Sequence, residues 1–491
     1  SAPARRIGPP ASKSSALHED PRTEFEEKAF LATLRSCVGR TGAPITARDP
    51  VNRAAIRNWC DAMRFDGEAA DDAAASGCGT APAAMLAVWN LPGNIPRVFD
   101  PDCPRGKVFA LLKEAGFASM IGTNTEEEYN RPLEVGELLT GTLSLLEVSE
   151  QKSTGLGTGY FVTTLTEFTN QTGERVGSWK FRTFNFRPRQ RTDEELAKAK
   201  QHREQQSRIA QHLLVRPRPA VMKETAFFWE GAKAGELRIQ QCRSCQRLAH
   251  PPVVRCPACG SYDLGYRVAS GKATLYSFVE PVHPPMPFMR YPYVVGLVEL
   301  EEGTRLLTNI VHCAPEQVRI GMPLELVFQQ TDPEMRLPMF RPVTPPPNRR
   351  TLPFGEVQPG QELPLHPIDV TTRRIVAGAI ATRDFEDIHH EMAAAKHAGL
   401  PDLFMNIFTT SGLCTRYVQA WAGPEARITG INVRLGTPNV AGDAMTLAGV
   451  VESCTAGRDT GKVNVTLRGR NAMGDHVTGT VTVELPQRGP R

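Results

Sequence analysis

Asp384 and His389 stand five positions apart in a short polar segment, and an alanine-rich run, residues 392–399, follows directly. A polar segment that ends in a histidine and leads into such a run predicts a loop entering a helix, with Glu391 in the first turn. A loop of this kind can bring a carboxylate and an imidazole to one small molecule. A carboxylate and a neutral imidazole that hold one water could remove its proton and aim its oxygen at an activated double bond.

The same residues allow a second interpretation. An aspartate near the start of a helix often caps it, and a histidine in a polar segment is often a solvated surface group. The residues by themselves leave the water-binding pair and the helix cap as alternatives.

The wider pattern favours the water-binding pair. Asp-x4-His followed by x-acidic-x3-Ala resembles the signature of the MaoC-like, hot-dog-fold (R)-specific enoyl-CoA hydratases. The resemblance implies that Asp384 and His389 hold the water. It also implies that a backbone N–H about eighteen residues after the histidine, here that of Ile407, donates to the thioester carbonyl. His390 could also hold the water, but the spacing favours His389 and leaves His390 as a supporting or surface residue.

The chain departs from that family at two places. The family usually has His-Gly-Met around the backbone donor, and this chain has Asn406-Ile407-Phe408. The family's Asn-Pro between the aspartate and the histidine is replaced by Glu386-Asp387. A backbone donor needs no particular side chain, so the donor survives the first change, whereas the bulk of isoleucine changes the shape of the acyl pocket.

Composition excludes several classes of function. The 491 residues predict about three domains, and 41% hydrophobic with 22% charged residues is typical of globular proteins. A net charge of +4 is small for this length and does not indicate nucleic-acid binding. No apolar run approaches the roughly 18 residues that span a bilayer, and residues 1–21 lack the apolar core of a signal peptide. We therefore expect a cytoplasmic protein without a membrane span.

Two CxxC pairs carry the most specific metal signal. Cys242, Cys245, Cys256 and Cys259 have the spacing of a four-thiolate zinc site, and Pro257 and Gly260 suit the tight turns. Such usage, in a chain with eleven cysteines, indicates a reducing compartment. All four ligands are thiolates, which leaves no open coordination position, so the predicted zinc is structural.

The segment around these cysteines, residues 221–342, also predicts a small β-barrel, because several short alternating strands follow the ribbon. Its sequence resembles the acyl-CoA-associated proteins that join a rubredoxin-like zinc ribbon to an OB fold (DUF35-type). The matching residues are Phe228-Trp229-Glu230-Gly231, His250-Pro251-Pro252, Ser270-Gly271, Pro292-Tyr293-Val294-Val295 and Ile320-Gly321-Met322-Pro323. The resemblance implies a docking or acyl-CoA-handling module. An OB barrel can also bind single-stranded nucleic acid, but the acidic residues of these strands argue against that.

The remaining segments predict an α+β protein in which two hot-dog domains flank a rubredoxin-like zinc ribbon and an OB-fold β-barrel. Helices are expected at 24–37, 51–60, 391–398 and 403–422, and strands at 141–148, 160–168, 175–186, 368–370, 426–435, 444–456, 462–471 and 476–484. The predicted domains are a disordered lead-in (1–21), a catalytically silent MaoC-like hot dog (22–191), a charged helical linker (192–220), a helix with the zinc ribbon (221–262), the OB fold (263–342), a Pro-rich linker (343–352) and a catalytic MaoC-like hot dog (353–488).

The order of domains looks like the two-component MaoC-like hydratase of steroid side-chain degradation, fused into one chain. The resemblance implies a hydro-lyase of lipid metabolism that adds water to a trans-2-enoyl-CoA with a cholesterol- or bile-acid-type side chain. Coenzyme A enters as part of the substrate, and no residue is assigned to it. The implied partner is a thiolase-fold aldolase docked on the OB module, and a homodimer is expected. The alternatives are a hot-dog acyl-CoA thioesterase and a non-enzymatic scaffold for a thiolase-like partner.

Overall fold

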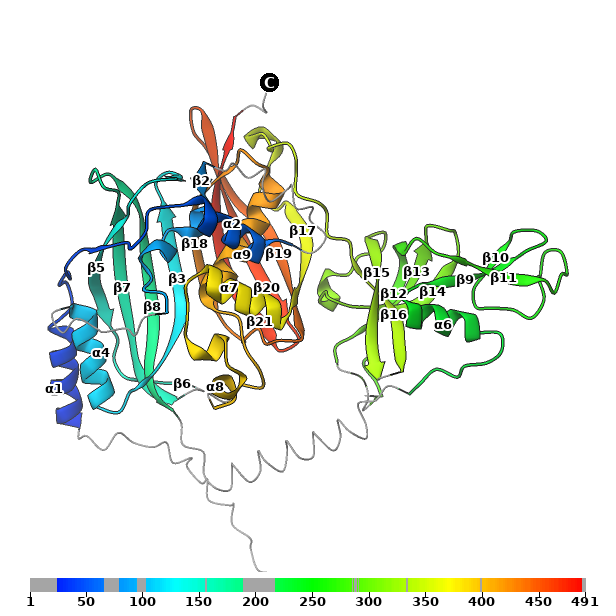
Figure 1. The fold of residues 1–491 in the computed structure, drawn as a ribbon, viewed down its shortest axis with the longest axis horizontal. Helices are drawn as coiled ribbons and strands as arrows, with labels where there is room; N and C mark the ends of the chain where they lie inside the picture. Colours follow the sequence, from blue (N-terminus) through cyan, green and yellow to red (C-terminus); the bar gives the residue numbers. More distant parts are fainter. Residues whose placement is uncertain are drawn as a thin grey trace, which may run out of the picture.

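The computed structural model describes residues 24–65, 79–94, 103–154, 157–188, 217–284, 286, 289, 291–332, 334–397 and 400–487. The predicted lead-in and residues 192–216 of the predicted charged linker lie outside these ranges. The described parts form two packed hot dogs and a separate module that projects away from them (Figure 1).

The described part of the N-terminal hot dog combines α-helices with a strongly curved antiparallel sheet. Its helices are α1 (Glu24–Arg35), α2 (Arg53–Met63) and α4 (Pro104–Glu114), with short 3-10 turns η1 (Ala83–Met85) and η2 (Val88–Asn90). Its strands are β1 (Ile45–Thr46), β2 (Thr80–Ala81), β3 (Ser119–Tyr129), β4 (Leu133–Glu134), β5 (Thr140–Val148), β6 (Lys152–Thr154), β7 (Gly157–Thr169) and β8 (Arg175–Pro188). Neither α4 nor β3 was expected from the sequence.

The C-terminal hot dog wraps its sheet around the long helix α9 (Ile407–Ala422), which is buried along nearly its whole length. Its other helices are α7 (Thr372–Ala381), α8 (Met392–His397) and the 3-10 turns η4 (Phe354–Glu356) and η5 (Asp387–His389). Its strands are β17 (Glu362–Val370), β18 (Arg427–Leu435), β19 (Asp443–Ala456), β20 (Thr460–Asn471) and β21 (Gly474–Pro486). The sequence analysis missed α7, which follows its N-cap Thr371 and leads into the loop that holds Asp384 and His389.

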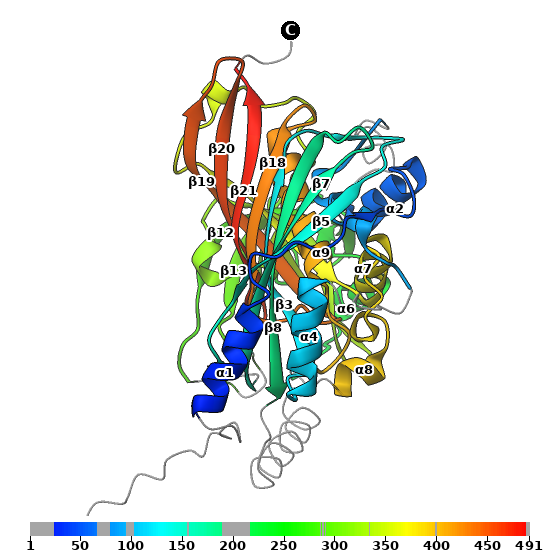
Figure 2. The same cartoon turned by 90° about the vertical axis from the view of Figure 1, so that its left-hand side faces the viewer.

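The two hot dogs share one sheet within the chain. The strand order is β1-β5-β7-β8-β3-β18-β21-β20-β19-β17, and the junction is the antiparallel pair β3–β18, in register from Gly430 opposite Glu128 to Arg434 opposite Asn124. Figure 2 shows this continuous sheet, with α2, α7 and α9 on one side of it. Backbone hydrogen bonds across the junction therefore fix how the two hot dogs are oriented.

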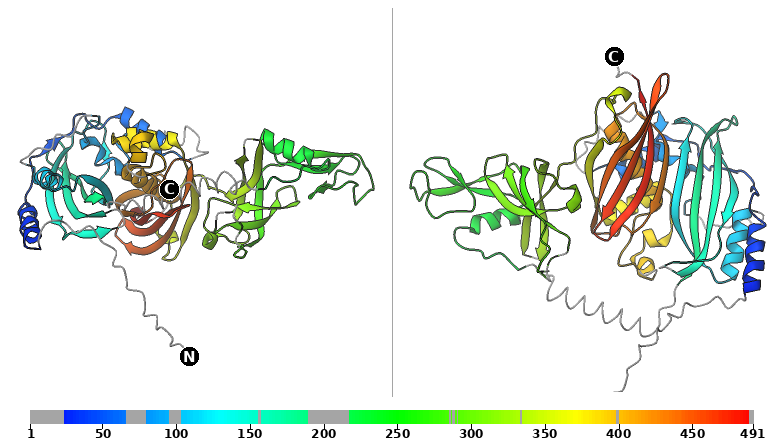
Figure 3. Two further views of the ribbon diagram at one scale, coloured as in Figure 1. Left: turned by 90° about the horizontal axis from the view of Figure 1, so that it is seen from below. Right: turned by 180° about the vertical axis from the view of Figure 1, so that it is seen from behind.

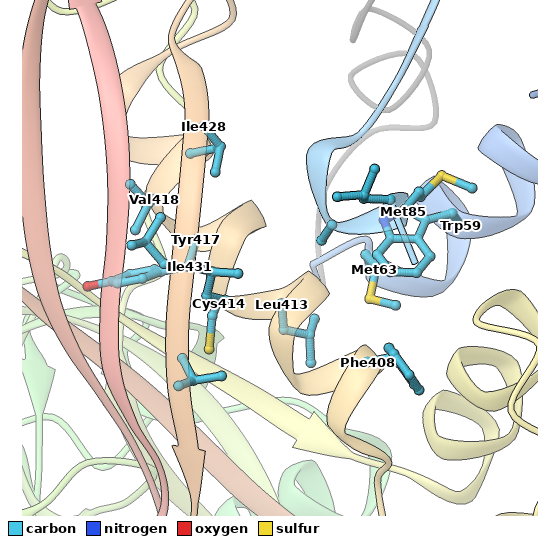
Figure 4. Close-up of a cluster of buried hydrophobic side chains, with 14 of the residues drawn as sticks. Trp59, Met63, Met85, Phe408, Leu413, Cys414, Tyr417, Val418, Ile428 and Ile431 are labelled. Atoms are coloured by element: carbon cyan, nitrogen blue, oxygen red, sulfur yellow. The ribbon is translucent and has the colours of Figure 1, made fainter. Parts of the chain in front are cut away.

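One hydrophobic core also crosses between the hot dogs. Trp59 and Met63 of α2 lie beside α9, and a Cβ added to Gly412 of α9 would come within 2.8 Å of both side chains (Figure 4). Phe408 and Leu413 of α9 belong to the same buried cluster. Because α2 comes from the N-terminal hot dog, this core helps to hold α9 in place from both domains.

The middle of the chain forms a zinc ribbon and a closed barrel. The ribbon has helix α6 (Ala226–Ala234) and strands β9 (Arg238–Cys242), β10 (Leu248–Ala249) and β11 (Leu264–Val268). The barrel runs β12-β13-β14-β16-β15, with β12 (Lys272–Val279), β13 (Val294–Leu300), β14 (Arg305–Ile310), β15 (Pro323–Asp332), β16 (Met335–Pro342) and the turn η3 (Pro315–Gln317). This five-stranded closed barrel is an OB fold, as expected.

The module meets the C-terminal hot dog at a small polar interface. Thr446 of β19 donates a hydrogen bond to the carbonyl of His312, and Arg470 of β20 lies 3.3 Å from Glu316. Most of the barrel and all of the ribbon extend away from the hot dogs (Figure 3). The second half of the predicted Pro-rich linker packs on the hot dog, because Asn348 and Leu352 donate backbone hydrogen bonds to the last turn of α9.

Candidate active site

The loop between α7 and α8 brings the predicted pair together. Oδ2 of Asp384 lies 3.6 Å from Nε2 of His389, and both side chains are buried. The helix α7 ends just before Asp384, and η5 turns the chain so that His389 faces back toward the carboxylate. Because both side chains are buried, the alternative of a helix-capping aspartate and a solvated surface histidine is wrong for Asp384 and His389.

The hydrogen bonds of His389 define its protonated nitrogen. Nδ1 lies 2.8 Å from the carbonyl oxygen of Phe404, which can only accept, so Nδ1 carries the hydrogen. Burial lowers the pKa of His389, which favours the neutral imidazole. Nε2 is then an acceptor that faces another acceptor, Asp384, across a gap too long for a hydrogen bond. One water could donate one hydrogen to each of them.

Asn406 is a site residue that the sequence analysis noticed only as a departure from the family. Its side-chain amide donates to Oδ2 of Asp384 (3.0 Å) and to Oγ1 of Thr382 (2.8 Å), while its Oδ1 accepts from the backbone N–H of Thr409 (2.8 Å). These three bonds fix the orientation of the amide, since a flipped amide would place its oxygen against the carboxylate. Asn406 therefore caps α9 and orients Asp384 at the same time.

His390 and Ile407 occupy different places around the pair. Nε2 of His390 lies 3.0 Å from the carbonyl oxygen of Asp384 and so donates to it, which leaves His390 bracing the loop. Ile407 is the first residue of α9, directly after the N-cap Asn406. The predicted start of this helix at residue 403 was wrong, because residues 403–405 bond to the backbone of 439–441 instead. The Ile407 N–H thus belongs to a helix N-terminus, where backbone N–H groups lack intrahelical partners.

The N-terminal hot dog supplies some of the residues that surround the first turn of α9. The rings of Trp179 and Phe181 lie 5.6 and 6.4 Å from that of Phe408. A Cβ on Gly122 of β3 would lie 3.9 Å from the side chain of Ile407. Aromatic side chains from the neighbouring domain therefore lie close to the first turn of α9.

The four predicted zinc ligands also converge. The sulfur atoms of Cys242, Cys245, Cys256 and Cys259 all lie within 4.8 Å of one another, with Cys242–Cys259 and Cys245–Cys256 both at 3.6 Å. A tetrahedral zinc with Zn–S bonds of about 2.3 Å requires sulfur atoms roughly 3.8 Å apart, so the cluster fits the ion. Backbone N–H groups of Cys259 and Ala258 lower the pKa of Cys256 to about 6, which favours the thiolate form that binds metal.

The thiol of Cys414 in α9 has no catalytic setting. Cys414 is fully buried in the core face of α9, and burial raises the pKa of its thiol to about 12. A protonated thiol in an apolar core is not a nucleophile. In the described ranges, the four-cysteine cluster is the one group with metal-ligand geometry, and no helix there is long and apolar enough to cross a membrane.

Fold and site together define a class of protein: a double hot dog joined to a zinc ribbon and an OB barrel, with a buried Asp–His pair in the loop that contacts the start of its central helix. Family models match accordingly. They are the FAS1-like dehydratase domain region (36–178), the ChsH2 rubredoxin-like zinc ribbon (229–265), the ChsH2 C-terminal OB fold (266–329) and the MaoC-like domain (356–472).

Known proteins agree with these models. A probable enoyl-CoA hydratase alpha subunit of Thermomonospora curvata is 40% identical over 321 residues, which are 64% of this chain and 96% of that protein. The 3-oxo-4,17-pregnadiene-20-carboxyl-CoA hydratase of Mycobacterium tuberculosis matches through both its subunits. Its alpha subunit is 35% identical (58% of this chain, 88% of the subunit) and its beta subunit 49% identical (23% and 83%). A solved structure named Ltp2-ChsH2(DUF35) aldolase matches 26% of this chain and 98% of its own at 50% identity, with a TM-score of 0.25. The chain belongs to the family of enoyl-CoA hydratases built from MaoC-like domains and a ChsH2 zinc-ribbon and OB module, which confirms the predicted family, fold and enzyme class.

Proposed function

We propose that the chain adds water to a trans-2-enoyl-CoA at Asp384 and His389, and that one polypeptide supplies what related hydratases divide between an alpha and a beta subunit. The observation that carries this proposal is the pair of facing acceptors, Oδ2 of Asp384 and Nε2 of His389, 3.6 Å apart. That arrangement suits a single water better than a direct hydrogen bond.

In the proposed reaction the water oxygen bonds to Cβ of the enoyl group while one proton leaves the water. Asp384 accepts that proton while His389 keeps the water oriented, and the same proton then passes from Asp384 through Nε2 of His389 to Cα. Cα is the carbon that gains electron density as the double bond is attacked. The proton removed from the water is balanced by the one delivered to Cα, so the pair returns to its starting state without a cofactor being consumed.

The developing enolate needs a donor for its thioester oxygen. The Ile407 N–H is proposed for this role, because it stands at the N-terminus of α9, a helix of 16 residues whose dipole favours negative charge there. The donor is preorganised, since Asn406 fixes the first turn of the helix.

For the substrate we propose a steroid side-chain acyl-CoA. Trp179, Phe181 and Phe408 form a largely buried aromatic cluster between the hot dogs, the kind of apolar surroundings that a bulky acyl group needs, and the related hydratase of M. tuberculosis is named for a steroid acyl-CoA. The test compares kcat/KM for a steroid enoyl-CoA and for crotonyl-CoA, followed by the loss of the enoyl absorbance. A preference of at least about tenfold for the steroid substrate is expected; equal values would limit the proposal to short enoyl-CoA.

Thioester hydrolysis is the competing outcome, because hot-dog folds also host thioesterases. A thiol reagent added to the same reaction detects the free coenzyme A that hydrolysis would release. Hydration leaves the thioester intact and releases no free coenzyme A, whereas a thioesterase would release thiol from saturated acyl-CoA as well. Release of thiol at the rate of enoyl loss would overturn the hydratase proposal.

We propose that the barrel docks a thiolase-fold aldolase. Its outer face carries exposed apolar side chains on β12 and β14, including Tyr276, Val279 and Leu307, and Leu307 is 68% exposed. Patches of this kind mark protein interaction sites. Leu307→Asp should abolish co-elution with a purified thiolase-fold aldolase and leave hydration unchanged. Ile45→Asp, at an exposed apolar residue of the other domain (61% exposed), is the matched control; equal effects of the two variants would exclude this face.

A further inference from the structure

Arg383, the residue directly before Asp384, has an unusual backbone. Its φ is +57°, in the left-handed region that favours glycine. Its N–H bonds to the carbonyl of Ile380 (3.0 Å), and the N–H of Asp384 bonds to that of Ala379 (2.9 Å). These two bonds form the Schellman motif that ends α7. An arginine therefore occupies the position where glycine is usual, and Asp384 is the next residue of the motif.

The side chain of Arg383 leaves its own domain. Nη1 lies 3.7 Å from Oδ2 of Asp49, and Nη2 would lie 3.4 Å from a Cβ placed on Gly93, so the guanidinium packs against that glycine. Both partners belong to loops of the N-terminal hot dog. Asp49 is 63% exposed, and an ion pair this open contributes little to stability. This ion pair therefore adds too little stability to explain why an arginine, and not a glycine, occupies the left-handed backbone position.

We propose that Arg383 is a positioning residue, which uses its contact with the N-terminal hot dog to hold Asp384 at the correct angle to His389. The inference rests on the proposed hydratase function. A small rotation at Arg383 moves the Asp384 backbone directly, because the two residues are consecutive in the turn. Asn406 holds the carboxylate from the side of α9, and Arg383 holds its backbone from the neighbouring domain.

The decisive variant is Arg383→Gly, because glycine adopts the left-handed backbone without strain and removes the cross-domain contact. We expect its thermal unfolding midpoint to equal or exceed that of the unchanged protein. We also expect kcat for a trans-2-enoyl-CoA to fall about 10- to 100-fold, the range a misplaced reacting group produces, with KM changing less than about threefold. Arg383→Lys, which keeps charge and most of the reach, should recover most of kcat.

Asp49→Asn completes the test as a double-mutant cycle. It should lower kcat when Arg383 is present and have no further effect in Arg383→Gly. Unchanged kcat in Arg383→Gly, or an equal effect of Asp49→Asn in both backgrounds, would overturn the inference while hydration by the unchanged protein still supports the proposed function. An unchanged protein that hydrates no enoyl thioester overturns the proposed function and this inference with it.

Discussion

The side-chain amide of Asn406, the N-cap of α9, donates a 3.0 Å hydrogen bond to Oδ2 of Asp384 in the loop between α7 and α8. The same amide caps α9 through the N–H of Thr409. The carboxylate that we propose as the proton acceptor and the helix that presents the backbone donor are therefore held by one side chain.

This link predicts that Asn406 has separable roles in stability and in activity. Asn406→Ala should lower both stability and activity. Loss of the cap should reduce the free energy of unfolding by about 1 kcal/mol, and kcat should fall about tenfold or more. Asn406→Ser keeps a capping oxygen but lacks the bridging amide, so we expect near-normal unfolding and a similar fall in kcat. Thermal unfolding and steady-state kinetics on both variants measure this. Full activity in Asn406→Ser would show that Asp384 needs no amide partner.

The proposed proton transfer predicts severe losses at the pair itself. Asp384→Asn keeps the shape and removes the proton acceptor, and His389→Ala removes the imidazole that orients the water. Each should lower kcat by roughly 10²- to 10⁴-fold, the usual contribution of a general acid or base. His390→Gln is the matched control, since the glutamine amide can also donate to the Asp384 carbonyl; a larger loss there than in His389→Ala would reverse the assignment of the two histidines.

The spacing of residues in the sequence predicted contacts within short segments and missed contacts that depend on tertiary packing. Asp384 and His389 lie in one loop, and the four cysteines lie in two CxxC turns of one short ribbon, so the spacing alone predicts that each group converges. The contact of Asn406 with Asp384 depends on how α9 packs against α7, and no local pattern reports that.

Strand β3 and helix α7 were missed for similar reasons. β3 has a run of three glutamates without simple alternation, and it forms a strand because β8 and β18 pair with it on both sides. Helix α7 opens with polar Thr372 and two arginines, which obscure the spacing of its buried residues Ile375 and Ala379.

Buried neutral histidines predict a loss of stability in mild acid. Burial lowers the pKa of His476 to about 4 and that of His366 to about 3, whereas an unfolded histidine has a pKa of about 6.5. The unfolded chain therefore binds more protons below about pH 6.5, so this stabilisation is complete above that pH and declines as the pH falls towards 4. The full effect for His476 is about 3 kcal/mol. Burial also raises the pKa of Glu127 to about 7, which stabilises the fold as the pH falls and opposes the histidines. Thermal midpoints between pH 7.5 and pH 5 should therefore be compared in the unchanged protein and in His476→Gln, where the effect of Glu127 is the same. We expect the loss of stability on acidification to be smaller in the variant; identical profiles would contradict the assignment.

Zinc should support the ribbon without taking part in hydration. We expect about one zinc per chain, and Cys245→Ser should reduce zinc content and loosen the ribbon. Hydration should persist, because the Asp384–His389 pair belongs to the shared hot-dog sheet and not to the module. Zinc analysis, limited proteolysis of residues 238–268 and the hydration assay measure the three effects. Loss of hydration in proportion to zinc would contradict a purely structural role.

The central claim is that one chain hydrates an enoyl thioester at Asp384 and His389. The most direct measurement follows the ultraviolet band of a steroid enoyl-CoA mixed with the purified, zinc-replete protein, beside the Asp384→Asn variant at equal concentration. We expect the band to disappear with the unchanged protein, with a product heavier by one water, and to persist with the variant. A band that persists with both proteins, or disappears equally with both, would contradict the account.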